Sequence, residues 1–298
     1  MQIRKAERKK AKLRLGISAP SGAGKTYSSL LIAYGITGDW EKIGLIDTEN
    51  GSGDLYAHLG DYMVLQLEAP YTPERYVKAI KAFEQAGVSV IIIDSLSHAW
   101  AGSGGALEMV DSSMAAQKNK FAAWRDVTPK HNELVEAMLQ SKCHIIATMR
   151  SKTEYVLEED EKGKKVPKKV GMAPIQRDGM EYEFTVMLDM AHNHVASASK
   201  DRTSLFDSQY FKPNEDMGKK LLEWLETGVD PEQQRLDLMA VVKAKWDECA
   251  GHEDVEGFTK WVTETRKKTE DTITYNELQA LDALLTDKLS KKGDAANA

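Results

Sequence analysis

Hydrophobic and polar residues follow one pattern in the first two-thirds of the chain and another in the last third. In the first part, short apolar runs of strand length alternate with stretches whose apolar residues recur at helical spacing. The strand-like runs are residues 13–18, 43–47, 88–94, 143–149, 184–190 and 194–197. This alternation predicts βαβ units and a mostly parallel sheet between helices.

Local residue choice marks several helix and hairpin boundaries. Thr72-Pro73 and Thr128-Pro129 each place Thr at an N-cap and Pro at the first helical position, so we expect a helix to begin at each. Gly87 should end the first of these helices. Residues 156–170 alternate around Asp160-Glu161-Lys162-Gly163, a pattern that predicts a hairpin projecting from the body.

The pattern changes near residues 227–231, where Asp230-Pro231 begins a series of helical stripes. Thr274 and Glu277 form a capping box before the last of the expected helices. We therefore predict an α/β domain over residues 1–228, a helical module over 229–290 and a disordered polar tail over 291–298.

The composition is that of a globular protein that needs no covalent staples. Of 298 residues, 42% are hydrophobic and 29% charged, and a chain of this length can bury a large core. Cys143 and Cys249 form no CxxC pair, which excludes a disulfide framework and a Cys-based zinc module and fits a reducing compartment. No apolar run is long enough to cross a bilayer, and the basic N-terminus lacks the apolar core of a secretory signal. We therefore expect a cytoplasmic protein without a membrane partner.

Charge is concentrated in particular segments. Residues 229–298 hold 15 acidic and 10 basic residues, whereas the remainder is nearly neutral, so the acidic helical module could offer a surface to a protein partner. Basic residues gather at 4–14 and again at 162–169, directly after the acidic run 158–161. Each basic segment is either a contact for nucleic-acid phosphates or a solvated surface that neighbouring charges compensate.

The clearest chemical motif is the P-loop Ala19-Pro20-Ser21-Gly22-Ala23-Gly24-Lys25-Thr26, which has Ala at the place of the usual first Gly. A strand precedes it and a helix follows, so its backbone N–H groups and the helix N-terminus can cradle phosphates. Lys25 is expected to reach the β- and γ-phosphates, and the Thr26 hydroxyl to bind Mg²⁺. The motif predicts ATP and Mg²⁺ as ligands. The residues expected to contact the nucleotide are Ser21, Gly22, Ala23, Gly24, Lys25, Thr26 and Tyr27.

Acidic residues end two of the expected buried strands. Asp94 follows four apolar residues, as in a Walker B strand, and is the expected Mg²⁺ ligand beside Thr26. Ser95 stands where AAA+ proteins usually carry the glutamate that activates water, so either the chain is not of that type or its base lies elsewhere. Glu49, at the end of strand 43–47, either orients that water or caps a solvated turn, and Asp47 is the next candidate.

Together these motifs resemble the RecA-type ATPases, which also have a P-loop, a strand ending in Asp-x-Glu and a strand ending in Asp-Ser. Residues 143–148 match the RecA strand that ends in a γ-phosphate sensor. RecA has Gln as that sensor, and this chain offers Thr148, Arg150 or Lys152. The resemblance covers residues 12–206. It implies an α/β, RecA-like P-loop NTPase core, with the C-terminal helical module outside it.

Two further segments look like those of phage-type RecA-like ATPases, a group that includes single-strand-annealing recombination proteins of the Sak type. They are Ala173-Pro174-x-x-Arg177-Asp178-Gly179-x-Glu181-Tyr182-Glu183-Phe184 and Ser199-Lys200-Asp201-Arg202-Thr203. This likeness implies an ATP-hydrolysing protein of DNA recombination, repair or annealing. Such a protein binds single-stranded DNA, forms a homo-oligomeric ring or filament and works in the host cytoplasm.

The resemblance also implies roles for two basic segments. Lys200 and Arg202 match cations that reach a neighbouring subunit's ATP and act like arginine fingers; otherwise they form a solvated turn. Residues 162–169, with Tyr155 and Tyr182 nearby, match a DNA-binding loop in which cations contact phosphates and aromatic rings stack on bases.

Two other functions stay open on the sequence. One is a motor or loader ATPase that serves a helicase or another replisome protein. The other is a small-molecule kinase, which normally needs a closing lid rich in Arg. Arg177 and Arg202 are few and scattered, so the sequence disfavours the kinase.

Overall fold

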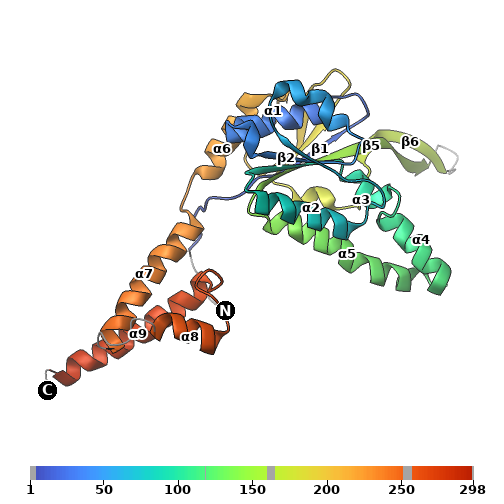
Figure 1. The fold of residues 1–298 in the computed structure, drawn as a ribbon. Coiled ribbons are helices and arrows are strands. Elements are labelled where there is room, and N and C mark those ends of the chain that lie inside the picture. Colours follow the sequence, from blue (N-terminus) through green and yellow to red (C-terminus); the bar gives the residue numbers. More distant parts are fainter. Residues whose placement is uncertain (1–4, 118, 160–164, 251–256, 297–298) are drawn as a thin grey trace. The chain divides into compact units, whose positions relative to one another are not determined.

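The computed structural model describes residues 5–117, 119–159, 165–250 and 257–296 of the chain. The chain divides into two compact units. One is Ala11–Leu225, and the other combines Met1–Lys10 with Glu226–Ala298. The first unit is α/β and the second is built mainly of helices (Figure 1).

A nine-stranded sheet forms the centre of the first unit. Its order is β3 (Met63–Gln66), β2 (Ile43–Asp47), β4 (Val90–Asp94), β5 (His144–Glu159), β1 (Arg14–Ala19), β7 (Val186–Met190), β8 (Ala196–Asp201) and β9 (Tyr210–Phe211), with β6 (Lys165–Pro174) paired to β5 off this path. The first six strands in this order are parallel, and β8, β9 and β6 pair in antiparallel fashion. The prediction of a mostly parallel sheet in an α/β P-loop NTPase core is therefore confirmed.

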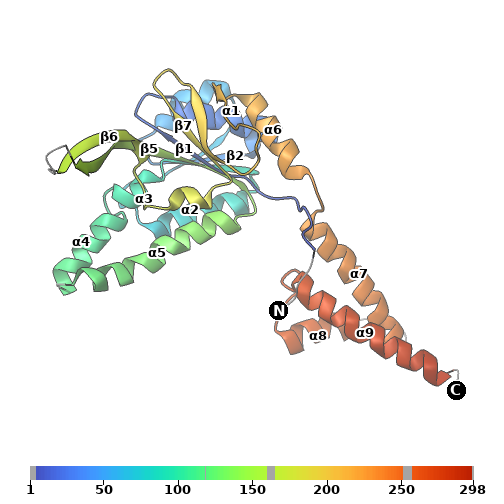
Figure 2. The same ribbon diagram turned by 180° about the vertical axis from the view of Figure 1, so that it is seen from behind.

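Helices cover both faces of this sheet, which explains why its central strands are apolar throughout. In β4, Val90 and Ile92 belong to one buried cluster, and Ile91 and Ile93 to the other. The first cluster includes apolar residues of α1 (Lys25–Thr37) and α6 (Glu215–Glu226); the second includes those of α2 (Pro73–Ala86) and α5 (Lys120–Gln140). Figures 1 and 2 show the two helix layers. A parallel strand buried on both sides needs such a continuous apolar run.

The helix boundaries agree with the sequence at one Thr-Pro pair and differ at the other. Helix α2 begins at Pro73, and Gly87 is its C-cap directly after Ala86, as predicted. The prediction at Thr128-Pro129 is wrong, because α5 begins at Lys120 and carries Pro129 in its interior. The cap is Asn119, whose side-chain oxygen accepts hydrogen bonds from the N–H groups of Phe121 and Ala122. This helix follows α3 (Ser97–Ala101) and α4 (Ala106–Gln117).

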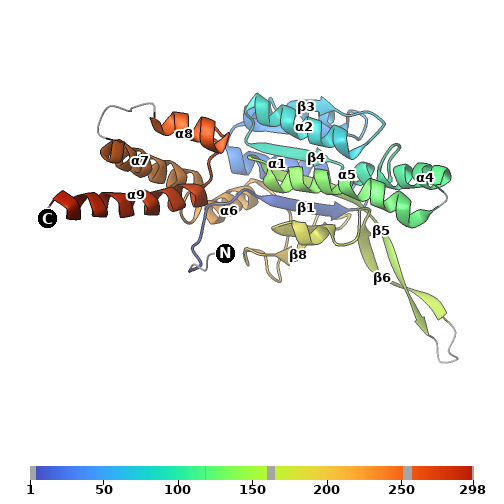
Figure 3. The same cartoon turned by 90° about the horizontal axis from the view of Figure 1, so that it is seen from below.

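Strands β5 and β6 form the expected hairpin. They pair from Ser151 opposite Pro174 to Glu159 opposite Lys165, and the hairpin projects beyond the sheet (Figure 3). The predicted turn at Asp160–Gly163 lies outside the described residues. The base of the hairpin therefore stands at the sheet edge where the parallel strands end.

The second unit contains α7 (Pro231–Ala250), α8 (Gly257–Arg266) and α9 (Tyr275–Ala296), which enclose their own apolar cluster. The capping box is present, since Thr274 N–H donates to Glu277 at 2.9 Å. Two details differ from the sequence-based boundaries: residues 5–10 group with this unit, and α9 continues to Ala296, within the segment 291–298 expected to be a disordered tail. Of the described helices, none is both long and apolar enough to cross a membrane.

The first of the two basic segments contacts the acidic unit of which it is part. Lys10 lies 2.6 Å from the Glu226 carboxylate, and Arg8 donates to the Thr227 hydroxyl at 2.6 Å. The Lys9 ammonium lies 5.7 Å from the centre of the Tyr275 ring. The ion pair with Glu226 compensates the charge of Lys10 within this unit, and Arg8 and Lys9 also have partners there.

Candidate functional site

The P-loop joins β1 to α1 and presents its backbone at the carboxyl edge of the parallel strands. Gly22 and Gly24 have φ values of 78° and 87°, in the left-handed region that favours glycine. Gly24 is the N-cap of α1, and no acidic side chain lies in the first turn of that helix. The free N–H groups and the helix dipole therefore favour an anion at this loop.

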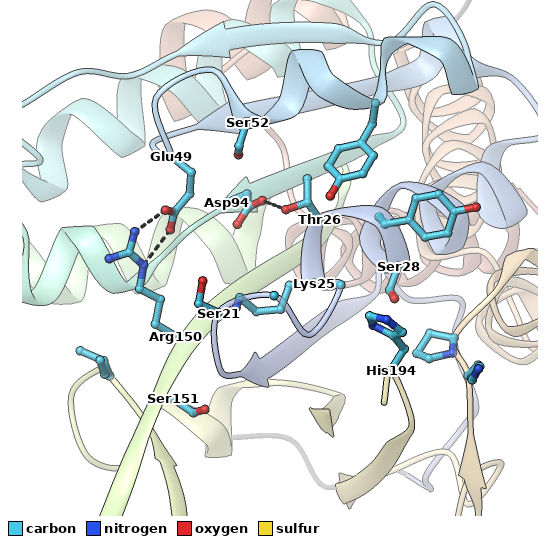
Figure 4. Close-up of a pocket in the computed structure, with 17 residues that line it drawn as sticks. Ser21, Lys25, Thr26, Ser28, Glu49, Ser52, Asp94, Arg150, Ser151 and His194 are labelled. Carbon is cyan, nitrogen blue, oxygen red and sulfur yellow. Dashed lines mark hydrogen bonds and ion pairs between the residues drawn. The ribbon is translucent and has the colours of Figure 1, made fainter. Parts of the chain in front are cut away.

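A cavity of about 890 Å³ opens over the P-loop (Figure 4). The carboxyl ends of β1, β2 and β4 and the base of the β5–β6 hairpin contribute to its wall, together with the loops around Tyr56, His194 and Pro213. The sequence-predicted residues that line it are Ser21, Gly22, Gly24, Lys25, Thr26, Tyr27, Glu49 and Asp94. Ala23, also part of the P-loop, is fully buried and does not line the cavity. Its carbonyl oxygen lies 3.0 Å from His194 Nδ1.

Asp94 and Thr26 meet at the floor of the cavity. The Thr26 hydroxyl donates to Asp94 Oδ2 at 2.5 Å, and the Thr148 hydroxyl donates to Oδ1 at 2.5 Å. Burial raises the pKa of Asp94, an effect that these two hydrogen bonds oppose. A hydroxyl and a carboxylate are hard oxygen ligands of the kind that Mg²⁺ takes from a protein when phosphates and waters supply the rest. The donor set therefore fits Mg²⁺. No group of three or more His, Cys, Asp or Glu side chains suited to a metal occurs among the described residues.

The Lys25 ammonium lies within the P-loop. Its Nζ donates to the carbonyl oxygens of Ala19 and Pro20, each at 3.0 Å. Burial lowers the pKa of Lys25, while the nearby carboxylates of Asp94 and Glu49 oppose that shift. A cation is thus held beside the anion-favouring backbone of the loop.

Glu49 is bound on both carboxylate oxygens. Its Oε1 accepts hydrogen bonds from Ser95 Oγ at 3.0 Å and from Arg150 Nε at 2.9 Å, and its Oε2 forms an ion pair with Arg150 Nη2. Burial would raise the pKa of Glu49, but the hydrogen bonds and charge of Arg150 outweigh it, and the pKa is lowered. Ser95, which occupies the place of the AAA+ glutamate, therefore contacts a carboxylate that comes from β2.

Asp47, the alternative carboxylate, organises the turn after β2. Its side chain is buried and accepts hydrogen bonds from Glu49 N–H at 2.6 Å and Gly53 N–H at 2.9 Å. It is not among the described residues that line the cavity. These contacts fix the position of the Glu49 backbone.

The three sensor candidates at the end of β5 differ in location. Thr148 is buried and bonded to Asp94, Arg150 lines the cavity, and Lys152 is exposed outside it. The backbone of Arg150 is held on both sides, because its N–H donates to Ser97 Oγ and its carbonyl accepts from Ile175 N–H. Only the Arg150 side chain, of these three, combines a fixed backbone with access to the cavity.

Lys200 and Arg202 do not line this cavity. Lys200 Nζ donates to the carbonyl oxygens of Glu181, at 3.1 Å, and Tyr182, at 2.5 Å. Arg202 donates to the same Tyr182 carbonyl at 3.0 Å. Burial and the charge of Arg202 lower the pKa of Lys200. Both cations are therefore gathered on the segment that contains η3 (Met180–Glu183), outside the cavity of their own chain.

The cavity also contains residues that carry no recognisable motif. Tyr27 and Tyr56 pair with ring centres 5.9 Å apart, and Tyr56 comes from η2 (Ser52–Leu59). His194 and Pro213 come from turns far along the chain. Tyr27 was predicted because it directly follows the P-loop, but for Tyr56, His194 and Pro213 the sequence offered no local signal. The packing of β7, β8 and β9 beside β1 brings His194 and Pro213 to the cavity.

In a comparison with protein-family models, residues 11–219 match a family described as an AAA domain. The match covers more than half of the chain and contains each element that contributes to the cavity. No curated protein matches the sequence.

Proposed function

The chain belongs to the AAA domain family of P-loop ATPases. Within it we propose a RecA-like ATPase of DNA recombination, repair or single-strand annealing, of the phage Sak type, because residues 173–184 and 199–203 resemble segments of that group. The observation that carries the proposal is the convergence of Lys25, Thr26, Asp94 and Glu49 on one cavity over a P-loop. The family membership also favours one of the two explanations for Ser95: the base lies elsewhere, on Glu49.

Each of these side chains has a distinct task in hydrolysis of ATP. The N–H groups of the P-loop and the Lys25 ammonium bind the phosphates. Thr26 and Asp94 would hold Mg²⁺, which when bound offsets the negative charge of the phosphates. Glu49 orients the attacking water and accepts its proton. Because Arg150 occupies both oxygens of Glu49, that carboxylate must be released before it can act as a base.

Arg150 is our choice for the γ-phosphate sensor. A γ-phosphate and the Glu49 carboxylate are both anions that a guanidinium binds well, so they compete for Arg150. ATP can therefore draw Arg150 away and free Glu49, whereas ADP lacks the group that competes. This exchange would couple hydrolysis to the presence of the third phosphate.

Replacing Arg150 with alanine should erase most of the preference for a triphosphate. We expect the ratio of ATPγS to ADP affinity to fall about tenfold, the value of one or two charge-assisted hydrogen bonds, and turnover to fall with it. Lys152→Ala is the matched control, because Lys152 follows on the same strand but is exposed outside the cavity. An unchanged affinity ratio in the Arg150 variant, measured by calorimetry, would remove Arg150 as the sensor.

The β5–β6 hairpin is the proposed contact for single-stranded DNA. Ser151 and Ile175, at its two ends, line the nucleotide cavity, so the hairpin begins and ends at the cavity wall. Its sequence supplies five lysines between 162 and 169 for contacts with phosphates.

Neutralising Lys164, Lys165, Lys168 and Lys169 together should weaken DNA binding and its dependence on salt. Each lost phosphate contact should reduce the slope of log affinity against log salt by about one. A control variant replaces four exposed lysines on helices α2 and α6, namely Lys78, Lys81, Lys219 and Lys220. Equal affinity and slope for the hairpin variant and the control, measured by fluorescence anisotropy across a salt series, would take the hairpin out of the DNA site.

Lys200 and Arg202 are proposed to complete the site of a neighbouring subunit in a ring or filament. Arg202→Ala should then bind ATP normally and turn it over slowly, because an arginine finger acts only on the transition state. Mixed with Lys25→Ala, it should regain turnover, since one chain supplies the intact cavity and the other the intact finger. If mixing restores no turnover, and turnover per subunit does not change with protein concentration, Lys200 and Arg202 have no role at a neighbouring site and only form a surface turn.

A further inference from the structure

The turn between β7 and β8 places a histidine against the P-loop. His194 N–H donates to the Ala191 carbonyl at 2.9 Å, and Ala191 N–H donates to the Val195 carbonyl at 2.9 Å. His194 has a φ of 63°, in the left-handed region of backbone conformation that residues other than glycine seldom adopt. The closed turn thus holds the imidazole in a defined position at the cavity wall.

Contacts with the P-loop fix which nitrogen of the imidazole carries the proton. His194 Nδ1 lies 3.0 Å from the Ala23 carbonyl oxygen, which can only accept a hydrogen bond. In the neutral ring Nδ1 is therefore the donor, and Nε2 carries the lone pair. The ring also fits closely over Gly24, where an added Cβ would lie 3.0 Å from Nδ1. The imidazole atom left for a ligand is the acceptor Nε2.

His194 lies on the side of the P-loop where the nucleoside of a bound nucleotide would be, away from Glu49 and Arg150. Figure 4 shows Glu49 and Arg150 on one side of the P-loop and His194 on the other, beside Ser28 of α1. Ser28 follows Tyr27, whose ring pairs with that of Tyr56 on the same cavity. Paired aromatic rings suit a base by stacking. The phosphate-binding groups and the aromatic groups therefore define a direction along the cavity, with His194 toward the aromatic end.

We propose that His194 reads the nucleoside of the bound nucleotide by accepting a hydrogen bond at Nε2. This inference rests on the proposed function of the cavity. ATP offers two kinds of donor at its nucleoside end, the ribose hydroxyls and the amino group of adenine. Inosine triphosphate lacks that amino group and carries an acceptor in its place. If the amino group is the donor, His194 selects ATP over nucleotides with an oxygen at that position.

The test compares nucleotide affinities of the wild-type protein and the His194→Phe variant. Phenylalanine retains a ring over Gly24 but has no acceptor nitrogen. We expect it to weaken ATP binding about five- to tenfold, the effect of one hydrogen bond, and to leave tripolyphosphate binding unchanged. His192→Phe is the control, since His192 lies in the same exposed turn and does not line the cavity.

Nucleotide analogues identify the donor on the wild-type protein itself. Deoxy-ATP lacking the 2′ or 3′ hydroxyl tests the ribose, and inosine triphosphate tests the base. The analogue that lacks the donor should bind the wild-type protein as weakly as ATP binds His194→Phe. Its affinity should be the same for the wild-type protein and for His194→Phe.

Three results would overturn the inference. Equal losses for ATP and tripolyphosphate in His194→Phe would show that the histidine only holds the P-loop. Equal affinity of the variant and the wild type for ATP would show that Nε2 touches no nucleotide. Wild-type binding of tripolyphosphate without any preference for ATP would show that the cavity does not read a nucleoside. By contrast, a wild type that binds neither ligand would overturn the proposed ATPase function itself.

Discussion

The Lys25→Ala variant is expected to lose ATP turnover by at least about 100-fold while it keeps its fold. In the proposed function the Lys25 ammonium stabilises the charge that develops on the phosphates, and removal of one such group commonly costs that much in rate. Lys25 is not part of the buried apolar core, and its Nζ donates to the carbonyl oxygens of Ala19 and Pro20, so its removal should leave the packing of the sheet intact. A phosphate-release assay measures the loss of turnover, and a thermal unfolding curve shows whether the fold is retained.

Lys42→Ala is the matched control for this variant. Lys42 is exposed on η1 (Trp40–Lys42), in the same unit but outside the cavity, so its removal should leave turnover unchanged. Near wild-type turnover by Lys25→Ala would show that the P-loop does not bind the phosphates that are cleaved.

The Glu49→Gln variant should bind ATP and hydrolyse it about 10²- to 10⁴-fold more slowly, the usual contribution of a general base. Glutamine has nearly the same shape but cannot take the proton of the attacking water. It also weakens the ion pair with Arg150, so ATP binding should not fall. Single-turnover hydrolysis and equilibrium binding of ATPγS separate the two effects.

Glu41→Gln is the control, since Glu41 is exposed on η1. Loss of ATPγS binding together with unfolding would assign Glu49 a structural role. Unchanged hydrolysis would move the base to another carboxylate, with Asp47 the next to test.

The proximity of the P-loop, Glu49 and Asp94 could be predicted from the sequence because each is a local pattern at a strand end. Parallel strands end at one edge of the sheet, so the loop after β1, Glu49 after β2 and Asp94 at the end of β4 had to lie near one another. This proximity follows from the direction of the strands alone, without knowledge of where each side chain points. The mostly parallel fold was predictable for the same reason, since strands buried on both faces are apolar throughout.

The parts that the sequence did not predict depend on contacts between distant segments. The choice among the sensor candidates Thr148, Arg150 and Lys152 rests on which side chain is buried and which one reaches the cavity. His194 lies 171 residues from Ala23 in the chain and meets it only because β7 packs beside β1. The start of α5 was missed because Asn119 provides a stronger cap than the later Thr-Pro pair.

Steady-state phosphate release from ATP by the full chain, with and without Mg²⁺ and single-stranded DNA, tests whether this cavity hydrolyses ATP. We expect turnover that requires Mg²⁺, rises when single-stranded DNA is added and disappears in Lys25→Ala. Turnover that rises with a helicase and not with DNA would favour the motor or loader function instead. Phosphate release no faster than that of Lys25→Ala under all of these conditions would contradict the claim that this cavity hydrolyses ATP.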